Sequence, residues 1–214
     1  FKIKNLKLKI GLLDNPEKFT PFGLNVGIKN AQGEIIIRMD AHAGYQNDYI
    51  SKCARSLEKY KADNVGGTMK TLPAKDTISA RAIALVLSGR AGAASRFRLG
   101  SEKVEEVDTV FGGCFKREVF DKIGLFNEKL IRGQDLEFNK RLKKSGGKII
   151  LDPSIVSTYH PQATLKGFWK HNFSDGFWIT YPLKFGIRYF SLRHLAPLFI
   201  TSLLILGFVF HQEP

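Results

Sequence analysis

Short apolar runs alternate with segments of helical periodicity along the first two thirds of the chain. Residues 35–39 and 64–69 are such apolar runs and predict buried strands. Helix starts are predicted at Thr20, at Asn47 or Asp48, and at Thr77. Strands that alternate with helices predict an α/β fold, a mostly parallel sheet flanked by helices.

The alternation resumes after a break at residues 91–107, which are rich in Gly, Ala, Ser and charge and which we expect to form a mobile loop. A strand is predicted at 107–111, running into Gly112 and Gly113, and a helix is predicted to open at 133–135 and to close at 146–147. Residues 148–151 and 155–159 predict further extended segments. Ligands of such sheets bind beyond the carboxyl ends of strands, which makes Asp40, after the strand at 35–39, a candidate site residue.

The last third of the chain has a different character. Residues 165–189 are aromatic and basic, and residues 195–210 are uncharged and apolar, slightly short of the ~20 residues that span a bilayer. The basic residues before the apolar run are typical of a cytoplasmic flank. We therefore expect a domain at 1–160, an interfacial helical segment at 161–194, and an apolar helix at 195–214 that is membrane-associated or begins a transmembrane helix; the alternative is a buried core helix.

The amino-acid composition narrows the classes of partner expected for the chain. The 33 Lys and Arg residues exceed the 20 acidic residues, a formal charge of +13, which favours nucleic acid, phosphorylated substrates or an acidic membrane surface. No segment resembles a common nucleic-acid-binding module, so we expect no nucleic-acid partner. The two cysteines, Cys53 and Cys114, form no CxxC motif and are expected to be reduced.

Two carboxylates and two histidines carry the candidate chemistry. Asp40 and His42 are spaced so that an extended backbone points both side chains the same way, and this pair suits a divalent ion such as manganese. The alternative is that Asp40 caps a turn and His42 is an ordinary polar residue. Asp135 opens a helix and is either a cap or a general base; His160, after a strand, is either a third metal ligand or a loop residue.

Taken in order, DNPEKFTPFGLNVGIKNAQGEIIIRMDAHAGY and VDTVFGGCFKREVFDKIGLFNEKLIRGQDLEFNKRLKKSGGKIILDPS resemble the family 2 glycosyltransferases. These enzymes have the GT-A (nucleotide-diphospho-sugar transferase) fold. The resemblance covers roughly residues 10–181 and is closest to the membrane-associated bacterial branch typified by succinoglycan biosynthesis. The QxxRW motif of the processive synthases is absent, which disfavours a processive polymerase.

The resemblance implies roles for these residues. Asp40 and His42 match the Asp-x-His motif that binds the metal of a nucleotide-sugar, Mn²⁺ or Mg²⁺, and His160 matches a further metal ligand found in some relatives. Asp135 matches the general base, and Gln134 stands where relatives often carry Glu. The remaining residues assigned to substrate binding are Gly112, Gly113, Glu137 and Arg38, where the glycine pair lets the acceptor approach and Glu137 orients it or faces solvent.

The resemblance also implies a reaction. It is inverting, metal-dependent transfer of a hexosyl-like sugar from a nucleotide-sugar, taken to be a UDP-sugar, to a lipid-linked or polysaccharide acceptor at the cytoplasmic face of the cell membrane. The family's first strand, which helps to bind the base, would precede Phe1; we therefore expect an N-terminally truncated chain that binds donor weakly. The alternative is a non-catalytic, degenerate GT-A module that binds glycan or a partner enzyme at the membrane.

Overall fold

The computed structural model describes residues 9–89 and 95–188, together with Ser202 and Gly207. The helices are α1 (Thr20–Asn30), α2 (Tyr49–Lys59), α3 (Ile78–Ser88), α4 (Arg96–Leu99), α5 (Arg117–Ile123), α6 (Gln134–Lys144) and α7 (Leu165–Thr180), followed by the 3-10 helix η1 (Tyr181–Phe185). The strands are β1 (Ile35–Ile37), β2 (Ala43–Tyr45), β3 (Asn64–Thr71), β4 (Glu105–Glu106), β5 (Cys114–Lys116) and β6 (Ile149–Tyr159). The α/β class predicted from the sequence is confirmed.

The sheet is mixed rather than mostly parallel, which corrects the expectation. Its six strands follow the order β1-β5-β3-β6-β2, with β4 paired to β6 off this path. Among the described strands, β3 and β6 form the single parallel pair, and the other four pairs are antiparallel. Parallel pairing was inferred from strand–helix alternation, but a loop rather than a helix leads into β5, so the chain enters that strand from the opposite end.

The hydrophobic core lies on both faces of the sheet, because successive residues of a strand point to opposite sides. One cluster contains Phe115 of β5 with Phe138 and Leu142 of α6, and the other contains Cys114 of β5 with Cys53 of α2. Both cysteines are free and buried, as expected for reduced thiols. The clusters anchor α2 and α6 on the sheet, and thereby fix the helix that opens at Gln134.

Several boundaries differ from the prediction. Residues 107–111 are not a strand; the extended segments of that region are β4 before it and β5 after it. The loop expected at 91–107 contains α4 and β4 in its described part. The two extended segments at 148–151 and 155–159 form one strand, β6, whose pairing with β3 shifts register between Gly66 and Thr68. The carbonyl of Ile155 lies only 1.9 Å from where a Cβ on Gly67 would be, so glycine is required at this irregularity.

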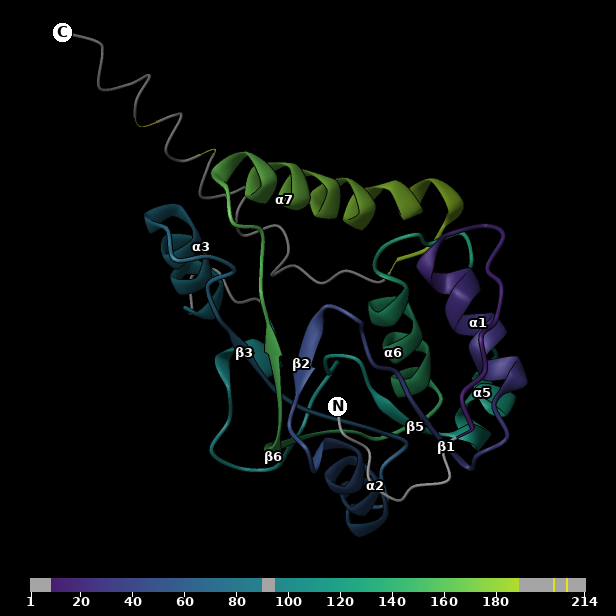
Figure 1. Ribbon diagram of the computed structural model, residues 1–214. Helices are drawn as coiled ribbons and strands as arrows, with labels where there is room; N and C mark the ends of the chain where they lie inside the picture. The colour runs from purple at the N-terminus through teal and green to yellow at the C-terminus, as the bar shows by residue number, and fades with distance from the viewer. Residues whose placement is uncertain (1–8, 90–94, 189–201, 203–206, 208–214) are drawn as a thin grey trace, which may run out of the picture.

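Helix α7 lies across the end of the sheet at which β6 ends, with α3 beside it and the first turn of α6 beneath it (Figure 1). Neither α7 nor any other helix of the described residues is long and apolar enough to cross a membrane. The apolar helix expected at 195–214 lies outside the described residues, Ser202 and Gly207 apart.

Candidate functional site

The carboxylate of Asp40 meets a cationic neighbour in its own loop. Arg38 Nε lies 3.2 Å from Asp40 Oδ1, and Arg38 Nη2 lies 3.5 Å from Oδ2. The two side chains are only 14% and 19% exposed, so the ion pair offsets much of the cost of placing a carboxylate there. Arg38, expected to bind substrate, therefore already has an anionic partner in the protein.

Asp40 lies in a turn and not on an extended segment, which corrects the basis for grouping it with His42. Strand β1 ends at Ile37, and Ala43 N donates a hydrogen bond to Asp40 O at 3.1 Å. The backbone N–H of Asp40 also donates to the Tyr45 hydroxyl, at 2.6 Å. Burial raises the pKa of this tyrosine, so its hydroxyl stays protonated at neutral pH. Tyr45 thus fixes the backbone of the turn that carries Asp40 and His42.

His42 and His160 flank the same end of the β2–β6 ladder. In that antiparallel pair Ala43 is opposite Tyr159, so His42 immediately precedes and His160 immediately follows the last paired residues. The ring centroid of His42 lies 6.1 Å from that of Tyr159. Both histidines are exposed, and His160 Nδ1 lies 3.3 Å from the carbonyl oxygen of Pro73. Sequence reasoning placed the two histidines at one site, and the topology brings their backbones to one end of the sheet.

The side chains at this end of the sheet offer a donor set for a metal ion. One carboxylate and two imidazoles are ligands that suit Mn²⁺, and both imidazoles are unburied. Within the described ranges, however, no three His, Cys, Asp or Glu side chains are gathered closely enough to hold an ion by themselves. The residues present therefore fit a site that offers an ion at most two protein ligands.

Asp135 occupies the first turn of α6, where a carboxylate is favoured by the helix dipole. Gly133 precedes the helix in the left-handed conformation, with φ 73°, which turns the chain sharply before Gln134. Asp135 is half-buried, and its Oδ1 accepts a hydrogen bond from Leu136 N at 2.9 Å. The neighbouring Gln134 is 6% exposed and its Oε1 has no partner within the described residues. A buried amide oxygen without a donor costs about 1–3 kcal/mol, so the start of α6 holds an unmet hydrogen-bonding group.

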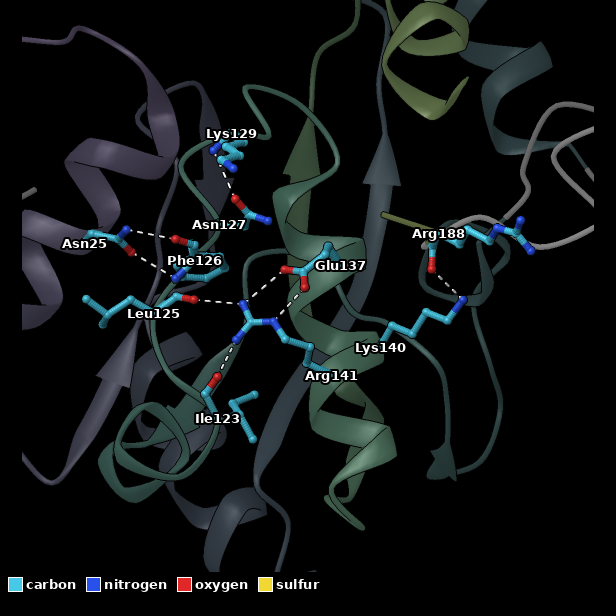
Figure 2. Close-up of polar contacts among 10 residues, drawn as sticks. All are labelled: Asn25, Ile123, Leu125, Phe126, Asn127, Lys129, Glu137, Lys140, Arg141 and Arg188. Atoms are coloured by element: carbon cyan, nitrogen blue, oxygen red, sulfur yellow. Dashed lines mark hydrogen bonds and ion pairs between the residues drawn. The ribbon is translucent and has the colours of Figure 1, made fainter. Parts of the chain in front are cut away.

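Glu137 is held by its own helix. Arg141 Nε and Nη2 donate to the two carboxylate oxygens of Glu137 at 2.6 and 3.0 Å, as Figure 2 shows. The same guanidinium donates to the carbonyl oxygens of Ile123 and Leu125, which ties the loop after α5 to α6. Asn25 of α1 holds the next residue of this loop through both N–H and C=O of Phe126. Glu137 therefore has a structural partner, and its place in the fold is explained without an acceptor.

Gly112 and Gly113 connect the site to the core. Their φ angles are 70° and 105°, a region that favours glycine. A Cβ on Gly112 would lie 2.9 Å from Arg38 O, and one on Gly113 would lie 2.5 Å from the Phe115 ring. Gly113 also accepts a hydrogen bond from Arg38 N at 3.0 Å. The glycine pair thus lets this loop pack against the residues that lead to Asp40, which is a requirement of the fold whether or not an acceptor approaches.

Contacts that the sequence did not reveal join the two parts of the site. Arg132, two residues before Gln134, forms an ion pair with Asp175 of α7, and His171 lies 3.3 Å from the other oxygen of that carboxylate. Arg98 of α4 lies over the ring of Tyr159, 5.3 Å from its centroid. Three of these residues, His171, Asp175 and Arg98, belong to the aromatic and basic region or to the expected loop, where charged residues without helical periodicity were the available signal.

Comparison with known proteins identifies the family. The glycosyl transferase family 2 model matches residues 4–124, more than half of the chain, and the chain therefore belongs to glycosyl transferase family 2. It is 28% identical, over 97% of its length, to dolichyl N-acetyl-alpha-D-glucosaminyl phosphate 3-beta-D-2,3-diacetamido-2,3-dideoxy-beta-D-glucuronosyltransferase of Methanococcus voltae. It is 26% identical, over 76% of its length, to succinoglycan biosynthesis protein ExoA of Rhizobium meliloti (strain 1021), which confirms the expected resemblance to the succinoglycan branch.

Solved structures confirm the GT-A fold. The chain superimposes on S. aureus TarS 1-349 with a TM-score of 0.51 at 15% identity, covering 82% of this chain and 49% of that one. It superimposes on the mannosyltransferase PcManGT from Pyrobaculum calidifontis, solved in complex with GDP-Man and Mn2+, with a TM-score of 0.51 at 17% identity, covering 84% and 47%. The chain spans 69% and 50% of the two curated relatives and about half of these solved chains.

Proposed function

We propose that this protein is an inverting, metal-dependent glycosyltransferase that moves a hexosyl-like sugar from a nucleotide-sugar to a lipid-linked or polysaccharide acceptor. Family membership supports the reaction class. The observation that carries the proposal is the chain of contacts beneath α7: Arg132 to Asp175 on one side, and Arg98 to Tyr159 to His42 on the other. Asp175 also interacts electrostatically with Arg98, which links the loop before Asp135 to the ladder end that carries the candidate metal ligands.

In this proposal Asp40 and His42 hold the Mn²⁺ or Mg²⁺ that accompanies the donor, and His160 lies at the same ladder end. When bound, the ion offsets the negative charge of the departing diphosphate. Arg38 holds Asp40 in the turn through its ion pair and thereby positions this carboxylate. The imidazoles of His42 and His160 are exposed and therefore accessible to a substrate.

Asp135 acts as the general base in this proposal. Its carboxylate accepts the proton of an acceptor hydroxyl while that oxygen attacks the anomeric carbon from the face opposite the nucleotide, which inverts the configuration. The hydrogen bond from Leu136 N to Oδ1 leaves the second carboxylate oxygen available for that proton. The unpartnered Oε1 of Gln134 is suited to accept a hydrogen bond from a second hydroxyl of the acceptor sugar.

We also propose that the protein binds the cytoplasmic face of the membrane through an apolar face on α7 and α3. Four apolar residues spaced by four positions form a stripe on α7 and are exposed by 48–68%: Leu165, Trp169, Phe173 and Phe177. Helix α3 contacts α7 and exposes Ile78, Leu85 and Val86. The net charge of +13 favours anionic phospholipid.

Sedimentation with phosphatidylcholine vesicles, with and without phosphatidylglycerol, tests the membrane proposal. Trp169→Ser with Phe173→Ser should reduce the bound fraction at least tenfold. The matched control is Leu12→Ser, which removes an apolar side chain that is 99% exposed but is distant in sequence from α3 and α7. Equal binding by all three proteins would refute this face as the membrane contact.

The transfer reaction is tested by release of free nucleoside diphosphate from UDP-sugars, with GDP-mannose as a second donor. Release should require both an acceptor and Mn²⁺ or Mg²⁺, and Asp40→Asn should reduce it at least tenfold. Asp48→Asn, which changes an exposed carboxylate paired with Lys52, is the control and should retain the wild-type rate. Release that is insensitive to divalent ions would refute the metal assignment.

The second candidate function is a non-catalytic module that binds glycan or a partner enzyme. Two observations favour it: Arg38 already neutralises Asp40, and no three-ligand group exists among the described residues. It predicts glycan binding with no nucleoside diphosphate released from any donor. Acceptor-dependent release by the wild-type protein would eliminate it.

A further inference from the structure

Arg98 is a charged side chain near the site that has no role in the proposed mechanism. It belongs to α4, and its guanidinium lies 5.9 Å from the ring centroid of Phe97 and 5.3 Å from that of Tyr159. The Nη1 atom is buried without a hydrogen-bond acceptor, and within the described part of the chain the guanidinium forms no ion pair. An arginine offers five N–H donors, and leaving the buried Nη1 donors unmet costs free energy.

The charges around Arg98 do not balance it. Burial lowers the pKa of its guanidinium, while the nearby Tyr159 and Asp175 raise it. Asp175 is the nearest carboxylate of this set, but it is already shared by Arg132 and His171. The single carboxylate of Asp175 is thus shared by two arginines, Arg98 and Arg132, and does not fully balance the charge of Arg98.

The position of Arg98 is central to the candidate site. The ring beneath it, Tyr159, is the last residue of β6 and contacts the ring of His42. On the other side, Asp175 connects to Arg132 in the loop that leads to Asp135. Through Tyr159 and its electrostatic interaction with Asp175, Arg98 is therefore connected both to the candidate metal ligands and to the loop before α6.

We propose that Arg98 binds a phosphate group of a substrate, with the ring of Tyr159 as the surface that holds its guanidinium flat. A planar guanidinium pairs with two phosphate oxygens at once, and stacking on an aromatic ring fixes its orientation before the ligand arrives. The inference rests on the proposed function, which supplies two sources of that chemistry: the diphosphate of the donor and the phosphate of a lipid-linked acceptor.

The competing explanation is that Arg98 only packs on Tyr159 to close the sheet end. Cation–π contacts of this kind contribute about 0.5–1 kcal/mol at exposed sites and more when desolvated, so packing alone accounts for the stacking. It does not account for a buried Nη1 without an acceptor. The two explanations differ in what happens to anion binding when the charge is removed.

Calorimetric titration with inorganic pyrophosphate, UDP and dodecyl phosphate separates these explanations. If the donor diphosphate is the ligand, Arg98→Gln should weaken the binding of pyrophosphate and UDP at least tenfold. If the phosphate of the acceptor is the ligand, the same substitution should weaken the binding of dodecyl phosphate at least tenfold. Arg96→Gln is the matched control, since Arg96 is in the same helix but pairs with Glu105 at the surface. It should change each dissociation constant less than twofold.

Arg98→Lys guards against misfolding of the glutamine variant. It keeps the positive charge but not the planar fork, and should weaken binding about three- to tenfold with a melting temperature within a few degrees of wild type. Unchanged affinity for all three anions in Arg98→Lys and Arg98→Gln, or no binding by wild type, would overturn the inference.

The outcome is separable from that of the proposed function. Arg98-dependent binding of pyrophosphate in a protein that transfers no sugar would support this inference and refute the transferase proposal. Sugar transfer by the wild-type protein, together with anion binding that is unchanged in the Arg98 variants, would support the transferase proposal and refute this inference.

Discussion

The clamp that Arg141 forms around Glu137 and the loop after α5 gives a sharp test of the fold near the site. Arg141→Ala removes two hydrogen bonds to Glu137 and two to the carbonyls of Ile123 and Leu125. It also removes the guanidinium that lies 5.1 Å from the ring centroid of Phe138, a residue of the core. The substitution therefore affects both an ion pair and the packing of the loop.

The expected change in the free energy of unfolding depends on how deeply the Glu137–Arg141 pair is buried. Removing one partner of a fully buried pair costs about 3–5 kcal/mol, whereas an exposed pair is worth about 0–1 kcal/mol. Glu137 is 12% exposed and Arg141 is 30% exposed, which places this pair between those limits. We expect Arg141→Ala to lower the free energy of unfolding by about 2–3 kcal/mol and Glu137→Gln by about 1–2 kcal/mol.

Urea denaturation followed by tryptophan fluorescence measures the change, and the double variant Glu137→Gln with Arg141→Ala gives the coupling energy. We expect a coupling of about 1–2 kcal/mol, because each single substitution leaves the other partner without its counterpart. Lys140→Ala is the control: its Nζ donates to Arg188 O from an exposed position, and the change should stay below about 0.5 kcal/mol. If Arg141→Ala were no more destabilising than Lys140→Ala, the clamp would not hold the loop.

Three further predictions concern the sheet, a helix and a buried carboxylate. Gly67→Ala should destabilise the protein by about 3 kcal/mol or more in urea denaturation, since its Cβ would collide with Ile155 O; a loss below about 1 kcal/mol would contradict the close approach of β3 and β6. Gly27→Ala, in α1 with no atom within 4 Å of its Cβ, should stabilise the protein by about 0.5–1 kcal/mol, and a lower melting temperature would contradict this. Burial raises the pKa of Asp152, but hydrogen bonds from Ser56 and Ser154 outweigh this effect and lower the pKa overall. The carboxylate therefore stabilises the fold above its unfolded pKa of about 4, and this stabilisation is lost as pH falls through the lower folded value. Asp152→Asn should flatten this acid-side loss in pH-dependent melting, and an unchanged profile would refute the assignment.

Local patterns in the sequence predicted the elements that carry most of the site. Thr20-Pro21 marked the start of α1, the isoleucines marked β1, and Gly133 marked the turn into α6. Each of these signals depends on a few adjacent residues. The start of the helix that carries Asp135 was therefore predictable, whereas the turn that carries Asp40 was expected to be an extended segment.

Short and irregular elements were not predictable in the same way. Strand β2 has three residues and α4 has four, too few for a periodic pattern. On α2, the apolar Ile50 is 57% exposed, while the polar Ser56 is buried and donates to Asp152 across 96 residues of sequence. Long-range polar pairing can thus override apolar periodicity.

The composition of the site was predictable in its residue types but not in its partners. Asp40, His42 and His160 were named from spacing and resemblance, and the topology does bring the two histidines to one ladder end. The ion pair of Arg38 with Asp40 depends on a turn whose shape the alternating pattern did not reveal. Contacts such as Arg98 with Tyr159 join residues distant in sequence, and a single chain carries no local signal for them.

The measurement that tests the central claim most directly is the rate of nucleoside diphosphate release by Asp135→Asn, with nucleotide binding measured on the same sample. A general base contributes about 10²–10⁴-fold, so we expect the rate to fall by at least a hundredfold while the dissociation constant for UDP changes less than threefold. Asp121→Asn, an exposed carboxylate on α5, is the control and should keep the wild-type rate. Full acceptor-dependent release by Asp135→Asn would show that Asp135 is not the base and would contradict the account.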